Sequence, residues 1–264
     1  MPFLDLSAGP TFYREAGDGT PPVVLLHGFG GTHRVWSAVQ DELADSHRSY
    51  ALDLRGAGRS ARPGSYRLED YLTDLGEAVA SLGLDRLALV GYSMGALIAA
   101  AWVAAHPERV ERLVLVAPAP LDGIPPGREQ EAAAQTYQRI QARRLDRSAQ
   151  LADLRRSSPR ALSERVIEAL IEDDRSWDPT AVRAVLDGLG GARTLNALGA
   201  SGVPVLVVAG DRDRLLPLQL ADAGRLPNRG LHVFYRVGHL LPLEVPALLS
   251  TLIDDFVAHG VRVP

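Results

Sequence analysis

The chain has 264 residues, of which 46% are hydrophobic and 23% are charged, so it has enough apolar material for a large globular core. Its formal net charge of −4 offers no basic footprint of the kind that binds nucleic acid. It contains no cysteine, and all 28 basic residues counted as Lys or Arg are arginine. This composition excludes disulfides, thiolate catalysis, lysine Schiff bases and the lysine of a phosphate-binding loop.

The amino terminus, M-P-F-L-D-L, lacks the basic segment and apolar stretch of a secretory signal. No apolar run in the sequence approaches the roughly 18 to 20 residues that span a bilayer. We therefore expect a cytoplasmic protein that does not contact a membrane.

Short runs rich in Val, Leu and Ala alternate with helix-like segments along the chain. Continuous apolar runs of this length are typical of parallel strands that are covered on both faces. The expected strands are residues 22–27, 49–53, 86–91, 113–116, 205–209 and 231–235. Segments 68–82 and 94–106 are long enough to be crossover helices. The pattern predicts a doubly wound, mostly parallel α/β sheet, with its site at the carboxyl ends of the strands.

The stretch from about residue 121 to residue 198 interrupts this alternation, because it has no strand pattern. It is polar and rich in Arg, Ala and Glu, and Ala133, Tyr137 and Ile140 follow helical spacing. We interpret it as a helical cap inserted between two strands. The core would then comprise residues 1–120 and 199–264, and the cap residues 121–198.

The sharpest motif is G-Y-S-M-G at residues 91–95, which lies directly between an expected strand and an apolar helix. A serine at such a tight strand-to-helix turn has a strained backbone, so small residues must flank it. The turn exposes the hydroxyl near the positive end of the helix. This context predicts that Ser93 is a nucleophile.

A serine hydroxyl needs a base to take its proton. His239 follows the last expected strand, and Gly238 before it can present the imidazole toward the edge of the sheet. His232 lies inside that strand, whereas His106 and His259 lie at or near helix ends, so we interpret these three as structural or surface residues. We predict His239 as the base; the other histidines considered are His27, His33 and His47.

The orienting acid is expected in the loop G-D-R-D-R-L-L-P at residues 210–217, after the penultimate strand. One aspartate would lie beside the imidazole, while the other would pair with an arginine or cap the turn. Spacing alone does not decide between Asp211 and Asp213.

With these motifs the chain resembles the α/β-hydrolase superfamily, specifically its members with a serine nucleophile and a cap domain. The resemblance runs from H-G-F-G-G at residues 27–31 to Gly238-His239, and it includes D-L-R-G-A-G-R-S at residues 53–60. The order serine, acid, histidine is that of this class. The family's acid precedes the proline of G-x-x-D-x-x-x-P by four residues. The resemblance therefore implies Asp213.

The resemblance also implies an oxyanion hole made by the backbone N–H groups of Phe29 and Met94, while His27 would hold the loop in shape. Two fixed donors would stabilise the charge that develops when the hydroxyl attacks a carbonyl. Phe29, Tyr92 and Trp177 are candidate substrate contacts. We expect no cofactor, no metal, a small-molecule substrate and a monomer or homodimer.

The expected reaction is hydrolysis of a small to medium ester, lactone or thioester through an acyl-enzyme. One alternative uses the same residues for carbon–carbon cleavage or elimination. The loop at residues 27–32 is somewhat similar to a pyruvate-eliminating member of the family, but Ala96-Leu97 stand where that group commonly has an arginine. The other alternative is a non-enzymatic ligand sensor. A serine nucleophile argues against haloalkane dehalogenases and epoxide hydrolases.

Overall fold

The computed structural model describes residues 2–123, 146–188 and 193–260. Its strands are β1 (Phe3–Leu6), β2 (Gly9–Ala16), β3 (Val23–Leu26), β4 (Ser49–Leu52), β5 (Leu87–Tyr92), β6 (Val110–Val116), β7 (Val205–Gly210) and β8 (Arg229–Phe234). Its helices are α1 (Ser37–Leu43), α2 (Leu68–Ser81), α3 (Met94–Ala105), α5 (Arg147–Ser157), α6 (Glu164–Ser176), α7 (Pro179–Gly188), α8 (Leu195–Ala200), α9 (Leu216–Arg225), α10 (Leu241–Glu244) and α11 (Pro246–His259). Two 3₁₀ turns cover His33–Trp36 and Pro107–Arg109.

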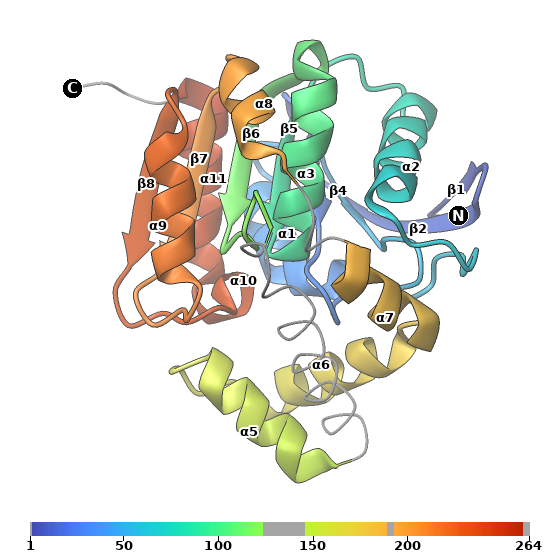
Figure 1. Ribbon diagram of the computed structural model, residues 1–264, viewed down its shortest axis with the longest axis vertical. Coiled ribbons are helices and arrows are strands. Elements are labelled where there is room, and N and C mark those ends of the chain that lie inside the picture. Colours follow the sequence, from blue (N-terminus) through green and yellow to red (C-terminus); the bar gives the residue numbers. More distant parts are fainter. Residues whose placement is uncertain (1, 124–145, 189–192, 261–264) are drawn as a thin grey trace.

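The strands form one eight-stranded sheet in the order β1-β2-β4-β3-β5-β6-β7-β8 (Figure 1). The strands from β4 to β8 in this order pair in parallel, whereas β1 with β2 and β2 with β4 are antiparallel. The predicted doubly wound, mostly parallel α/β sheet is therefore confirmed. The hairpin β1–β2 was not predicted, because β1 has only four residues and β2 contains Thr11, Arg14 and Glu15, so neither strand forms a continuous apolar run.

Both faces of the central strands β3, β4, β5 and β7 are buried, as the continuous apolar runs predict. The edge strand β8 differs from this expectation, because Leu231 and Val233 are exposed. On β3, Val24 and Leu26 join a cluster with residues of α2, α3, α8 and α9. Val23 and Leu25, which point the other way, join a cluster with residues of α1 and α11. The two helical layers fix the sheet, and with it the strand ends that carry the predicted site residues.

Helices α5, α6 and α7 come between β6 and β7 in the chain and lie together beyond one end of the sheet (Figure 1). The insertion is closely tied to the rest: Ala181 and Val182 of α7 are fully buried in the first core cluster. Helix α8 packs on α3 and α9, so the expected boundary after residue 198 falls inside a helix of the core. The helical spacing noted at Ala133, Tyr137 and Ile140 lies outside the described residues.

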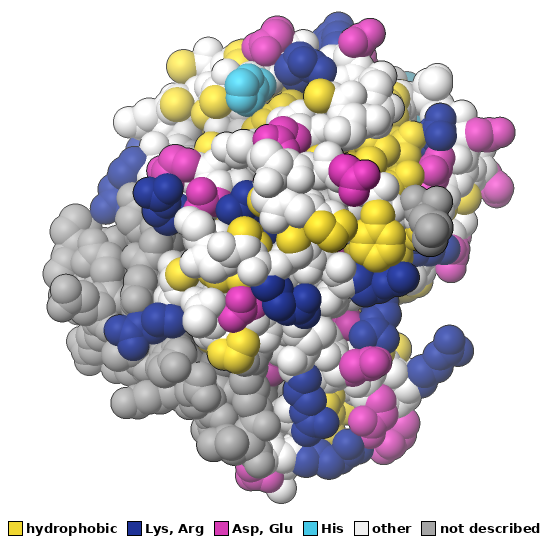
Figure 2. Space-filling view, turned by 90° about the vertical axis from the view of Figure 1, so that its right-hand side faces the viewer, with side chains coloured by type: hydrophobic (Ala, Val, Ile, Leu, Met, Phe, Trp, Pro, Cys, Tyr) yellow, Lys and Arg dark blue, Asp and Glu magenta, His cyan; other side chains and the backbone are white. Residues whose placement is uncertain are grey.

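Charged side chains of both signs are interspersed on the face seen in Figure 2. In the insertion, Arg147 pairs with Glu168 and Arg156 pairs with Asp153. Within residues 2–123, 146–188 and 193–260, no helix has the length and apolar character needed to cross a membrane.

Candidate active site

Ser93 occupies the turn between β5 and α3, with φ 52° and ψ −112°, a conformation that side chains rarely adopt. Its N–H donates to the carbonyl of Val116 on the neighbouring strand at 2.9 Å. A Cβ at Gly91 would lie 2.4 Å from the carbonyl oxygen of Gly95, and one at Gly95 would lie 2.5 Å from that of His27. Both flanking glycines are therefore required by close backbone approach, and the strained turn leaves the serine side chain partly exposed.

His239 lies beside this serine: its Nε2 is 3.1 Å from Ser93 Oγ. The histidine follows β8, and its backbone N–H donates to the carbonyl of Ser157, the last residue of α5, at 2.7 Å. A Cβ at Gly238 would lie only 2.2 Å from that same carbonyl oxygen. A glycine before the histidine thus makes room for the end of α5, which in turn anchors the backbone of His239.

Asp213 completes the chain of contacts, because its Oδ2 lies 2.7 Å from His239 Nδ1. The carboxylate also accepts hydrogen bonds from the backbone of Leu215 at 2.9 Å and from the side chain of Gln219 at 2.8 Å. Burial alone would raise the pKa of Asp213, but the bonds and charge of His239, with the other two donors, lower it overall. An ionised Asp213 makes Nδ1 the protonated nitrogen, which leaves Nε2 free to accept the serine proton.

Asp211, which spacing left as an equal candidate, lies elsewhere in the loop. Its carboxylate accepts from the backbone N–H of Val237 at 3.3 Å and lies 3.7 Å from the guanidinium of Arg212. The loop is held against the histidine loop by backbone contact, since a Cβ at Gly210 would lie 2.3 Å from the carbonyl oxygen of Val237. The structure thus brings Asp213, and not Asp211, to His239.

The loop after β3 passes directly over the serine. A Cβ at Gly28 would lie 3.1 Å from Ser93 Cβ, so the neighbouring Phe29 is held close to the nucleophile. His27 is fully buried; its Nδ1 bonds to the carbonyl of Gly28 at 2.8 Å, and its Nε2 accepts from the backbone of Leu54 at 3.0 Å. Burial lowers the pKa of His27, which suits a neutral ring. The bond to Leu54 joins the loops after β3 and β4, whereas the bond to Gly28 lies within the loop after β3.

A cavity of about 80 Å³ is lined by Tyr92 and Leu240, the chain neighbours of Ser93 and His239, although neither Ser93 nor His239 is among its described lining residues. Phe29, Tyr92 and Leu240 line its core side, and the ring of Tyr92 lies 5.4 Å from that of His239. Residues of α5 and α6 line the opposite side: Gln150, Leu154, Leu170, Ile171 and Asp174. Two of the three expected substrate contacts, Phe29 and Tyr92, therefore face this cavity.

Trp177, the third expected substrate contact, has a different environment. Its side chain is 2% exposed, its ring centroid lies 4.9 Å from that of Phe29, and its Nε1–H donates to the carbonyl of Gly31 at 2.8 Å. It is not among the described residues that line the cavity. Trp177 supports the loop that carries Phe29.

The loop D-L-R-G-A-G-R-S contains a second buried aspartate that is bonded to a histidine. Asp53 Oδ1 lies 2.7 Å from His33 Nδ1 and accepts the backbone N–H of His33 at 2.7 Å, while Oδ2 accepts from Arg59 at 3.0 Å. A Cβ at Gly58 would lie 2.3 Å from Oδ2, so the loop wraps tightly around the carboxylate. This motif stabilises the backbone next to the site.

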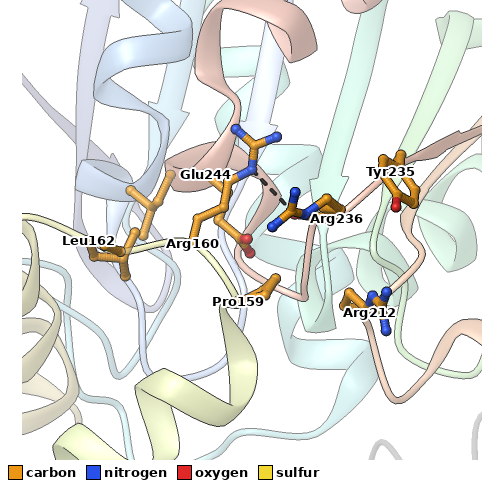
Figure 3. Close-up of a pocket in the computed structure, with 9 residues that line it drawn as sticks. Pro159, Arg160, Leu162, Arg212, Tyr235, Arg236 and Glu244 are labelled. Carbon is orange, nitrogen blue, oxygen red and sulfur yellow. Dashed lines mark hydrogen bonds between the residues drawn. The ribbon is translucent and has the colours of Figure 1, made fainter.

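A larger cavity, of about 830 Å³, lies between the segment that follows α5 and the segment that follows β8 (Figure 3). Arg160, Arg212 and Arg236 line it with the exposed ring of Tyr235. Its one carboxylate, Glu244, is already engaged by the backbone N–H groups of Gly238 and Leu240, each at 3.1 Å. Unlike the cavity of about 80 Å³, it has no chain neighbour of Ser93 or His239 among its described lining residues.

Reasoning from the sequence missed two polar residues of the site, Gln219 and Gln150. Gln219 is 1% exposed and joins Asp213 to the carbonyl of Pro118. Its position six residues after the acid, on the buried face of α9, is the only signal the sequence offers for it.

Within the described residues, no group of three or more His, Asp or Glu side chains is placed to hold a metal ion.

Comparison with known proteins places this geometry in context. A family model described as "alpha/beta hydrolase fold" matches residues 21–246. The chain is 30% identical over 266 residues to a 2-hydroxymuconate semialdehyde hydrolase of Pseudomonas sp. (strain CF600), covering 95% of this chain and 91% of that protein. Among solved structures, it is similar to an esterase from Exiguobacterium antarcticum (TM-score 0.86, 21% identity, 97% and 98% of the two chains). It is also similar to a thermophilic esterase from Thermogutta terrifontis (TM-score 0.81, 26% identity, 98% of each chain).

Proposed function

The chain belongs to the alpha/beta hydrolase fold family, and from this premise we propose that it is a serine hydrolase that cleaves a carboxylic ester, lactone or thioester without a cofactor. Ser93 is the nucleophile, His239 the general base and Asp213 the acid that orients it. The observation that carries the proposal is the continuous chain of contacts from Ser93 Oγ to His239 Nε2 and from His239 Nδ1 to Asp213, at 3.1 and 2.7 Å.

In the first step, His239 takes the hydroxyl proton as Ser93 Oγ bonds to the substrate carbonyl carbon. The resulting oxyanion is received by the backbone N–H groups of Phe29 and Met94; one such donor is worth about 3 kcal/mol in comparable enzymes. Collapse of this intermediate breaks the bond to the leaving group, to which His239 returns the proton. Asp213 stabilises the imidazolium throughout. Water then repeats the sequence on the acyl-enzyme and releases the acid.

The helices α5 and α6 act as the cap in this proposal, because they supply one side of the cavity that Tyr92 and Leu240 line from the core. The cavity of about 80 Å³ is mostly apolar in its lining, which favours a short substrate group in contact with Phe29, Tyr92 and Leu154. Residues 121–198 would therefore decide specificity, while the core supplies the chemistry.

A panel of p-nitrophenyl esters, lactones and acyl thioesters tests the proposal. We expect a burst of p-nitrophenol and an acyl adduct on Ser93 that mass spectrometry locates. Absence of any burst or adduct, together with a ligand-dependent melting shift, would instead identify a sensor that retains the site without using it.

Cleavage of a carbon–carbon bond by the same three residues is the second candidate. It is favoured by the 30% identity to a 2-hydroxymuconate semialdehyde hydrolase, which extends over 95% of the chain. Parallel assays with 2-hydroxymuconate semialdehyde and with simple esters separate the two candidates, since a higher kcat/KM for the former would replace ester hydrolysis as the main activity.

A further inference from the structure

Gln150 is a buried polar residue on the cap side of the cavity beside the nucleophile. Its side chain is only 2% exposed, and neither its Oε1 nor its Nε2 has a hydrogen-bond partner in the described part of the chain. Buried amide groups are nearly always hydrogen-bonded, because leaving them unpaired costs free energy. Gln150 lines the cavity together with Phe29 and Tyr92. An amide with both polar atoms unused, in the wall of a cavity that also contains the chain neighbours of Ser93 and His239, is suited to bind a ligand.

The placement of Gln150 relative to the reacting atoms follows from helix geometry. The carbonyl of Ser157, at the end of α5, accepts the backbone N–H of His239, so this end of the helix is held next to the proposed general base. Gln150 precedes Ser157 by seven residues, or two turns, and therefore lies on the same face of α5, about 10 Å along its axis. Leu154, between them on that face, also lines the cavity. Gln150 would therefore contact a substrate group several covalent bonds away from the reacting carbonyl. The part of the substrate between the two would lie against the apolar side chain of Leu154.

We propose that Gln150 is a specificity-determining residue that hydrogen-bonds an uncharged hydroxyl group on the substrate. The inference rests on the proposed function and defines its substrate class: an ester or related acyl compound whose cavity-filling part is an apolar segment ending in a hydroxyl. The amide offers both an acceptor and a donor, and a hydroxyl uses both.

The charge of the cavity lining favours a hydroxyl over a carboxylate. Asp174 of α6 also lines the cavity and is 5% exposed, and no described lining residue is cationic. An anionic substrate group would therefore be buried here without a countercharge. A hydroxyl carries no such cost and can donate to Gln150 Oε1.

Matched substrate pairs and the variant Gln150→Leu test the proposal. Each pair is a p-nitrophenyl or alkyl ester that carries a terminal hydroxyl, in either the acyl or the alcohol part, and its analogue with a methyl group in place of the hydroxyl. We expect wild-type kcat/KM to favour the hydroxylated member of at least one pair by about tenfold. Gln150→Leu should lose or reverse this preference and still hydrolyse the methyl analogue. An ester with a terminal carboxylate should be the poorest substrate of both proteins.

Thermal unfolding supplies a readout that a merely structural glutamine would not give. Without substrate, Gln150→Leu should melt about 2 to 4 °C above the wild type, because it removes an unpaired buried amide. A lower melting temperature, or a preference for the hydroxylated ester that survives in Gln150→Leu, would overturn the inference, as would equal wild-type rates on both members of every pair. If the wild type hydrolyses both members of every pair at equal rates and Ser93→Ala abolishes this activity, the proposed function stands and only the role of Gln150 is refuted. If the wild type hydrolyses no ester at all, both the proposed function and the role of Gln150 are refuted.

Discussion

In the described part of the chain, two buried aspartates are bonded to histidines, and the geometry of the two pairs is almost the same. Asp53 meets His33 Nδ1 at 2.7 Å, and Asp213 meets His239 Nδ1 at 2.7 Å. In both pairs the carboxylate accepts further N–H donors, and its pKa is lowered by them although burial opposes this. The difference lies at the far side of the imidazole, where His239 Nε2 meets the hydroxyl of Ser93 at 3.1 Å.

An aspartate–histidine pair is therefore not by itself a sign of catalysis. The pair at Asp53 ties together the loops after β3 and β4, and Gly58 wraps around its carboxylate. The pair at Asp213 ends at a serine in a strained, accessible turn. We therefore expect perturbation of the second pair to change activity and perturbation of the first to change stability.

The largest effect should come from removing the group that distinguishes the pairs. Ser93→Ala should lower kcat roughly a million-fold on any ester that the wild type turns over, because residues that act as a unit fail together. Circular dichroism and the melting temperature should remain close to those of the wild type. Residual activity within tenfold of wild type would show that the two pairs are more alike than proposed.

Asp213→Asn should be the next most severe change. An amide at this position no longer fixes the protonated Nδ1 tautomer, and kcat should fall about ten-thousand-fold. The matched control is Asp211→Asn, two residues away in the same loop, which should leave kcat nearly unchanged because Asp211 contacts Val237 and Arg212 instead of His239. Steady-state kinetics of the two variants decides the matter, and the reverse ranking would refute the assignment of the acid.

Asp53→Asn should act on stability. The substitution weakens three hydrogen bonds to a fully buried carboxylate, and we expect the free energy of unfolding to fall by about 3 kcal/mol. Urea unfolding measures this loss, while kcat at a temperature where the variant is folded should change far less than in Asp213→Asn. A collapse of kcat in a well-folded Asp53→Asn protein would contradict the division between the pairs.

A smaller effect is expected at Gln219, which has no counterpart in the Asp53 pair. Gln219→Leu removes one donor from Asp213, so kcat should fall about tenfold. The pKa of Asp213 should rise toward its ordinary value at the same time. A pH–rate profile separates this positioning role from simple loss of packing, because only the former moves the acidic limb of the profile to higher pH.

The smallest expected effect is the change with pH in the contribution of Asp53 to the free energy of unfolding. The folded pKa of Asp53 is lowered, so its contribution to stability is complete well above its unfolded pKa of about 3.9 and is lost as the pH falls through the folded pKa. The stability gap between wild type and Asp53→Asn should therefore be constant near neutral pH and narrow below about pH 4. Unfolding curves at pH 7, 4 and 3 would reveal it, and a gap that widens toward acid would have the wrong sign.

Much of the fold could be predicted because the central strands are buried on both faces, and such strands consist of continuous apolar runs in the sequence. The hairpin β1–β2 could not, since β1 has only four residues and β2 carries Thr11, Arg14 and Glu15, so neither strand forms a continuous apolar run. The serine turn was also predictable, because close packing demands Gly91 and Gly95 in fixed positions.

Contacts between loops were harder to predict. Spacing left Asp211 and Asp213 equal, and only the resemblance to a known family favoured Asp213. Gln219, Gln150 and the bond between Asp53 and His33 depend on how separate segments meet in space, and no local pattern records that. The proposed roles of these side chains, including those of Ser93 and His239, are tested by the variants above.

Gly210 helps to set the distance between the loop that carries Asp213 and the loop that carries His239. Its missing side chain lets β7 touch the main chain of Val237, and the N–H of Arg212 donates to the same carbonyl at 2.9 Å. The distance between the two loops is therefore set by contacts between backbone atoms, which cannot adjust by changing rotamer. A single methyl group at position 210 would act as a wedge between them, so the two loops can be transplanted into another scaffold only as one piece.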